Sequence, residues 1–143
     1  MLEYALTDYL YNDSVLKTYF TNPIYITQAP TSAVMPWLIL MPSGGTRTRI
    51  SRTKLEDINT VRVIADFPAT ESDMIKGRNA IERVKYLLEN YRGNMGTETM
   101  DSHNAYDVFI SCSAIEDIPG SSGTYRYQFT AKVRSIEDVV SPV

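Results

Sequence analysis

The sequence is poor in residues that carry chemistry. Its 143 residues include one cysteine, Cys112, and one histidine, His103. A lone cysteine excludes an intramolecular disulfide, and this is compatible with a reducing compartment. A lone histidine excludes a metal site built from several histidines. The longest apolar run, residues 37–41, is far shorter than the roughly 20 residues of a membrane span, and no basic segment precedes an apolar stretch at the N-terminus. We therefore expect neither a membrane helix nor a signal peptide.

What remains is the composition of a globular domain. Hydrophobic residues make up 43% and charged residues 22%, which argues against disorder. The formal net charge is −3, so the chain as a whole is no polycation for nucleic acid. The length fits a single domain, residues 1–143, with one core. Ten tyrosines suit half-buried strand faces and protein–protein interfaces, because each has an apolar body and a polar tip.

The N-terminal half predicts one helix followed by three strands. Apolar residues recur at helical spacing from Leu2 to Leu10, and Ser14 is the expected cap of a short second turn. Strands are expected at residues 24–27, 37–41 and 58–67. Pro30 should end the first strand because it lacks an N–H, and Pro36 should set the entry of the second, with residues 31–34 as a surface turn.

The C-terminal half predicts a long helix and two more strands. Thr70 and Asp73 resemble a capping box, and Gly93 stands where a helix C-cap is expected, which gives a helix over residues 71–92. Strands are expected at 106–114 and 125–134, with a frayed tail from about 137. The order α-β-β-β-α-β-β indicates an α+β domain: an antiparallel or mixed sheet with two helices packed on one face.

No set of residues forms a convincing catalytic or metal site. Cys112 alternates in phase with the apolar residues of its strand, so it should face the core. His103 lies in a polar loop beside Asp101 and Ser102 without a nucleophile-elbow pattern. The pairs Glu56/Asp57 and Asp101/Asp107 are typical of solvated charges, and Gly44-Gly45 lacks the helix and Gly-Lys ending of a phosphate loop. We expect no catalytic residue, no metal and no cofactor; an enzyme using His103 or Cys112 is the least favoured interpretation.

One cluster of charge stands out, in a basic hairpin arm expected at about residues 43–57. It carries Arg47, Arg49, Arg52 and Lys54. Three interpretations remain open at this point. The arm could be a solvated hairpin tip, it could contact acidic surface on a neighbouring subunit, or it could contact nucleic-acid phosphates with help from Lys132 and Arg134.

The ordered motifs resemble a known family. They are I-Y-x-x-x-A-P from Ile24, P-W-L-I-L from Pro36, a Gly-containing basic hairpin, a strand ending in D-F at Phe67, the helix ESDMIKGRNAIERVKYLLENY, and the closing strand TYRYQFTAKV. Over residues 2–136 this order is similar to that of the tail terminator proteins of long-tailed phages, also called tail completion or tail-to-head joining proteins.

The resemblance implies a non-enzymatic structural protein of the virion, present in the host cytoplasm during assembly. It implies a hexameric ring that caps the tail tube, joins it to the head connector, and lets DNA pass through its lumen. The implied partners are further copies of the chain, the tail tube protein, a head connector or completion protein, and DNA in transit, with no membrane. The arm occupies the place of the family's variable hairpin. Another neck protein of the head–tail connection, or a small nucleic-acid-binding module, is the alternative.

Overall fold

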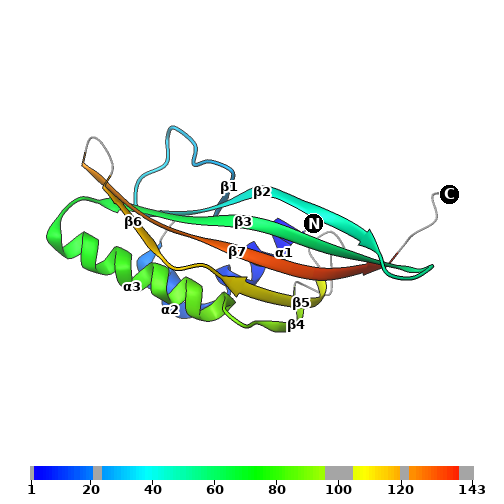
Figure 1. The fold of residues 1–143 in the computed structure, drawn as a ribbon. Coiled ribbons are helices and arrows are strands. Elements are labelled where there is room, and N and C mark those ends of the chain that lie inside the picture. The colour runs from blue at the N-terminus through cyan, green and yellow to red at the C-terminus, as the bar shows by residue number, and fades with distance from the viewer. Residues whose placement is uncertain (1, 21–23, 96–104, 120–122, 139–143) are drawn as a thin grey trace.

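The computed structural model describes residues 2–20, 24–95, 105–119 and 123–138, which form three helices and one sheet of seven strands (Figure 1). The elements in chain order are α1 (Leu2–Tyr11), α2 (Ser14–Tyr19), β1 (Tyr25–Ile26), β2 (Trp37–Arg49), β3 (Lys54–Pro68), α3 (Glu71–Leu88), β4 (Arg92–Met95), β5 (Ala105–Cys112), β6 (Glu116–Pro119) and β7 (Thr124–Asp138). None of the helices in these ranges is long and apolar enough to cross a membrane.

The sheet is mixed and is dominated by three long strands. Its order is β1-β2-β3-β7-β5-β4, with β6 pairing β7 beside this path. The short β1 runs parallel to β2, and the other pairs are antiparallel. The strands β2, β3 and β7 span 13, 15 and 15 residues and lie side by side along the whole molecule (Figure 1). The α+β class and the mixed sheet are confirmed.

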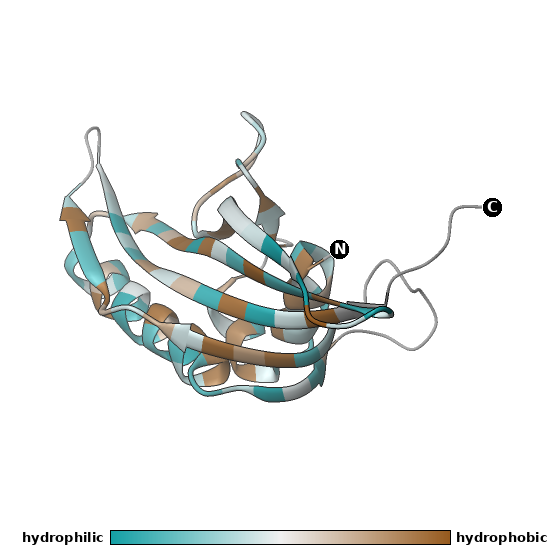
Figure 2. Ribbon diagram, turned by 45° about the vertical axis from the view of Figure 1, so that its right-hand side comes forward, coloured by the Kyte–Doolittle hydropathy of each residue, from teal (hydrophilic) through white to brown (hydrophobic). Residues whose placement is uncertain are grey.

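All three helices lie on one face of the sheet, where they bury a single apolar core. The alternation of the strands supplies one side of this core, and hydropathy changes from residue to residue along them (Figure 2). Val61, Val63, Ala65 and Phe67 of β3 are buried there as the alternation predicted, and so are the apolar residues from Tyr127 to Val133 of β7. The helices contribute Leu6, Leu10, Leu16, Ile81, Val84 and Leu88 to the same cluster.

The opposite face of the sheet is less polar than the alternation suggests. Ile39 and Ile64, which are Cα partners on β2 and β3, are buried on it. Asp66 is also buried, and its carboxylate accepts hydrogen bonds from Arg126 and from the indole N–H of Trp37. On this face, therefore, the buried carboxylate of Asp66 is paired with both an arginine and an indole N–H.

The helix ends show where local sequence reasoning works and where it fails. Thr70 caps α3 as expected, with its hydroxyl accepting from the backbone N–H of Asp73. The expectation for Ser14 is wrong, because Asp13 is the cap of α2 and accepts from the N–H of Leu16. The expected C-cap at Gly93 is also wrong: α3 ends at Leu88, and Gly93 lies in β4.

Some strand boundaries differ from those expected. The sequence did not predict the strands β4 and β6, each of four residues. The first strand, β1, ends at Ile26 and not at Pro30, and the next residue, Thr27, has a positive φ of 75°. The turn at residues 31–34 and the position of Pro36 directly before β2 are as predicted. The prediction of a frayed tail from residue 137 is wrong for its first two residues, because β7 continues to Asp138 and pairs with β3 there.

Candidate functional site

The predicted basic arm is a projecting ribbon of three strands. The ends of β2 and β3 form the expected hairpin, with Arg47 opposite Asp57 and Arg49 opposite Leu55. The end of β7 then lies along the free side of β3, so Ser135 faces Asp57 and Ile136 faces Glu56. A bulge between Pro42 and Gly44, with Gly44 at φ 123°, marks where the arm leaves the helix-covered part of the sheet. Figure 1 shows the arm at the right-hand end of the long strands.

Much of the arm's charge is paired within the arm. Arg47 makes a two-pronged ion pair with Asp57, with Nε to Oδ1 at 2.7 Å and Nη2 to Oδ2 at 3.2 Å. On the other face of the ribbon, Arg134 of β7 pairs with Glu56 of β3. The carboxylates that the sequence presented as a pair, Glu56 and Asp57, thus point to opposite faces and each neutralises an arginine. This arrangement leaves the arm less basic than its β2 sequence suggests.

The tip is a compact turn over residues 50–53. The backbone N–H groups of Ile50 and Ser51 both donate to the carbonyl of Lys54, and the N–H of Thr53 donates to the hydroxyl of Ser51. Arg49 reaches across the turn and donates to the carbonyl of Arg52 at 3.2 Å. Within the described ranges, the guanidinium of Arg52 makes no hydrogen bond or ion pair.

The four predicted arm residues therefore have different surroundings. Arg47 forms an ion pair with Asp57, and Arg49 donates a hydrogen bond to a carbonyl of the turn. Arg52 is exposed to solvent at the tip. Lys54 is exposed at the start of β3, opposite Asp138. The structure brings Arg49 and Arg52 together at the tip, while Arg47, two residues back along β2, pairs with Asp57.

Among the residues considered for catalysis, the structure describes Cys112 and Asp107 as well as the arm acids Glu56 and Asp57. Cys112 is half-buried and packs against the core as predicted; burial, reinforced by the Glu89 carboxylate, raises the pKa of its thiol to about 12. Such a thiol is protonated and unreactive at neutral pH. Asp101, Ser102 and His103 lie outside the described residues. Asp107 is exposed, and its backbone N–H donates to the side chain of Asn94.

A groove that the sequence did not predict lies where α1, the end of α3 and β4 meet. Its volume is about 340 Å³, and its lining residues are Asp8, Tyr9, Asn12, Asp13, Leu87, Tyr91, Asn94 and Met95. The chain positions that build it are far apart, which is why no local pattern indicated it. The one available signal was the last turn of α1, which contains an acid and no basic residue.

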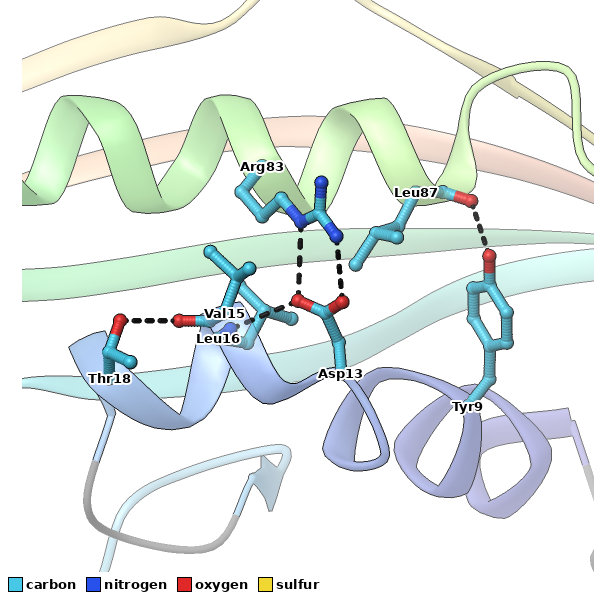
Figure 3. Close-up of polar contacts among 7 residues, drawn as sticks. All are labelled: Tyr9, Asp13, Val15, Leu16, Thr18, Arg83 and Leu87. Carbon is cyan, nitrogen blue, oxygen red and sulfur yellow. Dashed lines mark hydrogen bonds and ion pairs between the residues drawn. The ribbon is translucent and has the colours of Figure 1, made fainter.

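Fixed polar contacts give the groove its shape (Figure 3). The hydroxyl of Tyr9 donates to the carbonyl of Leu87 at 3.0 Å, and the ring of Tyr9 meets that of Tyr91 edge-on with centroids 4.9 Å apart. Asp13 accepts from Arg83 at 2.8 and 3.2 Å. The bond from Arg83 holds the pKa of the Asp13 carboxyl below its usual range, and burial raises the pKa of both tyrosines.

Neither the groove nor the arm contains a metal-binding set. Across residues 2–20, 24–95, 105–119 and 123–138, no group of three or more histidine, cysteine or acidic side chains is placed to hold an ion. Every buried side-chain nitrogen or oxygen in these ranges has a hydrogen-bond partner. The arrangement offers surfaces for binding, in the form of a projecting arm and an acidic, aromatic groove.

Comparison with known proteins identifies a structural likeness. No protein-family model and no curated protein matches the sequence. Among solved structures, a chain of the "Virion of native gene transfer agent (GTA) particle" superposes with a TM-score of 0.72. The match covers 95% of this chain and 95% of that chain at 13% sequence identity. At this level of identity the two chains share the fold.

Proposed function

We propose that this protein is a structural component of a phage-like particle, and that it acts as a tail terminator. In this role copies of the chain form a ring that caps the tail tube and joins it to the head connector. The ring would be hexameric, as the sequence resemblance implies, and DNA would pass through its lumen. The proposal assigns the protein no catalytic activity and no cofactor.

The observation that carries the proposal is the agreement in fold over nearly the whole of both chains. A chain of a gene transfer agent virion matches at a TM-score of 0.72 over 95% of each chain, so the two share the fold. The sequence motifs resemble tail terminators independently of this match. Because one fold can serve many functions, the specific role rests on the two likenesses together.

The arm geometry favours protein contacts over nucleic-acid contacts. A phosphate-binding arm needs cations that are free to replace counterions. Here Arg47 is paired with Asp57, and Arg134 with Glu56. The two arginines that no ion pair with an acid holds, Arg49 and Arg52, lie together at the tip, which suits one localised contact with another protein.

Light scattering and negative-stain electron microscopy of the purified protein, alone and mixed with the tail tube protein of the same particle, test this function. We expect six-fold rings, or caps on the ends of tail tubes. A protein that stays monomeric and neither forms rings with the tube protein nor caps tails would contradict the proposal. Binding to random duplex DNA at low salt that falls steeply with added salt would favour the nucleic-acid alternative.

A further inference from the structure

The face of the sheet opposite the three helices, here the outer face, carries a stripe of cations across its strands (Figure 1). Arg62 of β3, Lys132 of β7 and Arg92 of β4 are all exposed, and together they form the basic stripe. Arg62 faces Thr130 in the ladder, so Lys132, two residues further along β7, is its diagonal neighbour at about 7–8 Å. Arg92 faces Phe109 of β5, the strand between β4 and β7.

None of the three cations has an anionic partner in the part of the chain that the structure describes. The side chains of Arg62 and Lys132 make no hydrogen bond or ion pair there. The guanidinium of Arg92 lies over the ring of Phe109, with Cζ 4.5 Å from the ring centroid. This contact positions the guanidinium and uses none of its N–H donors. The stripe therefore presents three cations whose donors are available to a ligand.

Acids on the same face do not neutralise the stripe. Three of them have partners within the chain: Glu56 has Arg134, Asp66 has Arg126, and Glu116 has the amide of Gln128. The exposed Asp107 lies in the bulge of β5, where the register with β7 is interrupted. The stripe is thus locally positive although the formal net charge of the chain is −3.

The surroundings of the stripe suit phosphate groups. Lys132 has a hydroxyl residue opposite it in each ladder, Thr60 on β3 and Ser111 on β5. Hydroxyls and cations together are the usual donors to the phosphate oxygens of DNA. Protein–DNA interfaces are polar and strongly positive, whereas the centre of a protein–protein interface is apolar and aromatic. The strand ladders also hold the three backbone positions in a fixed array.

We propose that the basic stripe contacts the phosphates of duplex DNA, and that the outer face of the sheet is turned toward the lumen of the ring. The inference rests on the proposed function, which passes DNA through that lumen, and it assigns the DNA contact to the sheet and not to the arm. Three contacts from one subunit are weak, and repetition around a ring adds them. Contacts to phosphates carry no sequence information and allow a duplex to slide, as passage requires.

Matched charge reversals test the contact by fluorescence anisotropy with a short, labelled, linear duplex of random sequence. Wild-type protein should bind at low salt, and the slope of log K against log salt should be about −3, since each contact contributes about −0.9. Arg62→Glu combined with Lys132→Glu, the stripe variant, should lower the affinity at least about tenfold and bring the slope to about −1. Circular dichroism checks that each variant is folded.

Two further double variants serve as controls. Lys17→Glu with Lys76→Glu, the helix variant, makes the same change in net charge at exposed positions of α2 and α3. It should alter the affinity by less than about twofold, because salt screens distant charges. Arg62→Lys with Lys132→Arg keeps both charges and should retain the affinity within about threefold.

Several results would overturn the proposal. One is an equal loss of affinity in the stripe and helix variants, and another is a wild-type protein that does not bind duplex at low salt. A slope much steeper than −3 would need more cations than the stripe contains. A larger loss for Arg49→Glu with Arg52→Glu would assign the binding to the arm. Tighter binding of the wild type to polyglutamate than to duplex would make an acidic protein the partner.

Electron microscopy of the same variants separates this inference from the proposed function. The stripe variant should form rings or caps as the wild type does, because the stripe faces the lumen and not a neighbouring subunit. If the wild type assembles and the stripe variant does not, or if the stripe variant still binds duplex normally, the inference is wrong and the function stands. If the wild type forms neither rings nor caps, the function fails, while a loss of duplex binding confined to the stripe variant would still support the phosphate contact.

Discussion

The two ends of the long strands are stabilised by different means. We call the helix-covered part of the sheet the body and the end of the β2–β3–β7 ribbon, residues 43–57 and 134–138, the arm. In the body, side chains such as Val63 and Phe129 are at most 2% exposed. In the arm, every residue from Ser43 to Lys54 is exposed. One strand therefore passes from a region held by apolar burial to a region held by ladder hydrogen bonds and surface ion pairs.

The difference indicates which region can respond to a partner. Regions with little apolar burial open at low free-energy cost, while core strands open only with global unfolding. The arm can therefore adjust locally to a binding surface without disturbing the core. The same type of substitution should have a large effect in the body and a small one in the arm.

The largest effect is expected for Phe67→Ala in the body. Phe67 is 1% exposed and packs edge-on against Phe20 with centroids 5.5 Å apart, beneath Gly77 of α3. Removing the ring leaves a cavity under the helix and should cost about 3–5 kcal/mol of unfolding free energy. Denaturant unfolding followed by circular dichroism measures it. Ile50→Ala at the arm tip is the matched change and should alter stability by less than about 0.5 kcal/mol. Similar losses for both variants would contradict the distinction between a body stabilised by apolar burial and an arm that is not.

A smaller effect is expected for Asp66→Asn on the outer face of the body. Its carboxylate is 2% exposed and accepts from both Arg126 and Trp37. An amide cannot accept all of these bonds, and the variant should lose about 1–3 kcal/mol, with the lower end favoured because Arg126 is partly solvated. Asp57→Asn in the arm is the matched change, since Asp57 also faces an arginine directly across the ladder. We expect it to lose less than about 1 kcal/mol in the same unfolding assay.

Next in size is Asp13→Ala, which removes the cap of α2 and the partner of Arg83. The loss at pH 7 should be about 1 kcal/mol, as for other N-caps. The folded-state pKa of this carboxyl is lowered, chiefly by the bond from Arg83. The ionised Asp13 carboxylate therefore contributes fully to the stability of the fold when the pH is above the ordinary pKa range of aspartate. This contribution disappears as the pH falls through and below that range. Urea unfolding measures this: the difference in unfolding free energy between the variant and the wild type should be smaller in acid than at pH 7. Ser14→Ala, the neighbouring change, should have less effect at either pH.

The smallest effect is expected for Arg47→Gln in the arm. Arg47 is 56% exposed, so its pair with Asp57 should contribute about 0.2–1 kcal/mol. Salt screens exposed pairs, and the loss should vanish at about 1 M sodium chloride. Unfolding at low and high salt measures this. A loss that persists at high salt would mean that the arm is stabilised in the same way as the body.

The long alternations of apolar and polar residues in the strands allowed the body to be predicted from the sequence. The pattern from Tyr125 to Val133 identified both a strand and its buried face, because the pleat imposes a period of two. The strands β4 and β6 carry no such signal: each has four residues, and they contain Gly93 and Pro119, which are unfavourable in strands. Asp13 and Ser14 are both good caps, and the bond from Arg83 to Asp13 is a tertiary contact that the local sequence does not show.

The arm and the groove depend on long-range pairing, which a single sequence does not encode locally. The basic residues were visible, but their neutralisation by Asp57 and the support of β7 follow from a strand register set far along the chain. The groove combines residues of α1, of the end of α3 and of β4, which are far apart in the sequence. Its one local sign, an acid in the last turn of α1, is too common to identify a site without the fold.

The continuity of β2, β3 and β7 has a mechanical consequence. A pull on the arm tip along the strand axis would load the hydrogen bonds of both ladders in parallel, as shear. A pull across the sheet would instead peel them apart one at a time. An assembly that grips the tip along the strand direction therefore passes tension directly into the best-packed part of the molecule. The bulge at Pro42 and Gly44, where pairing is interrupted, is the place at which such a ribbon would bend first.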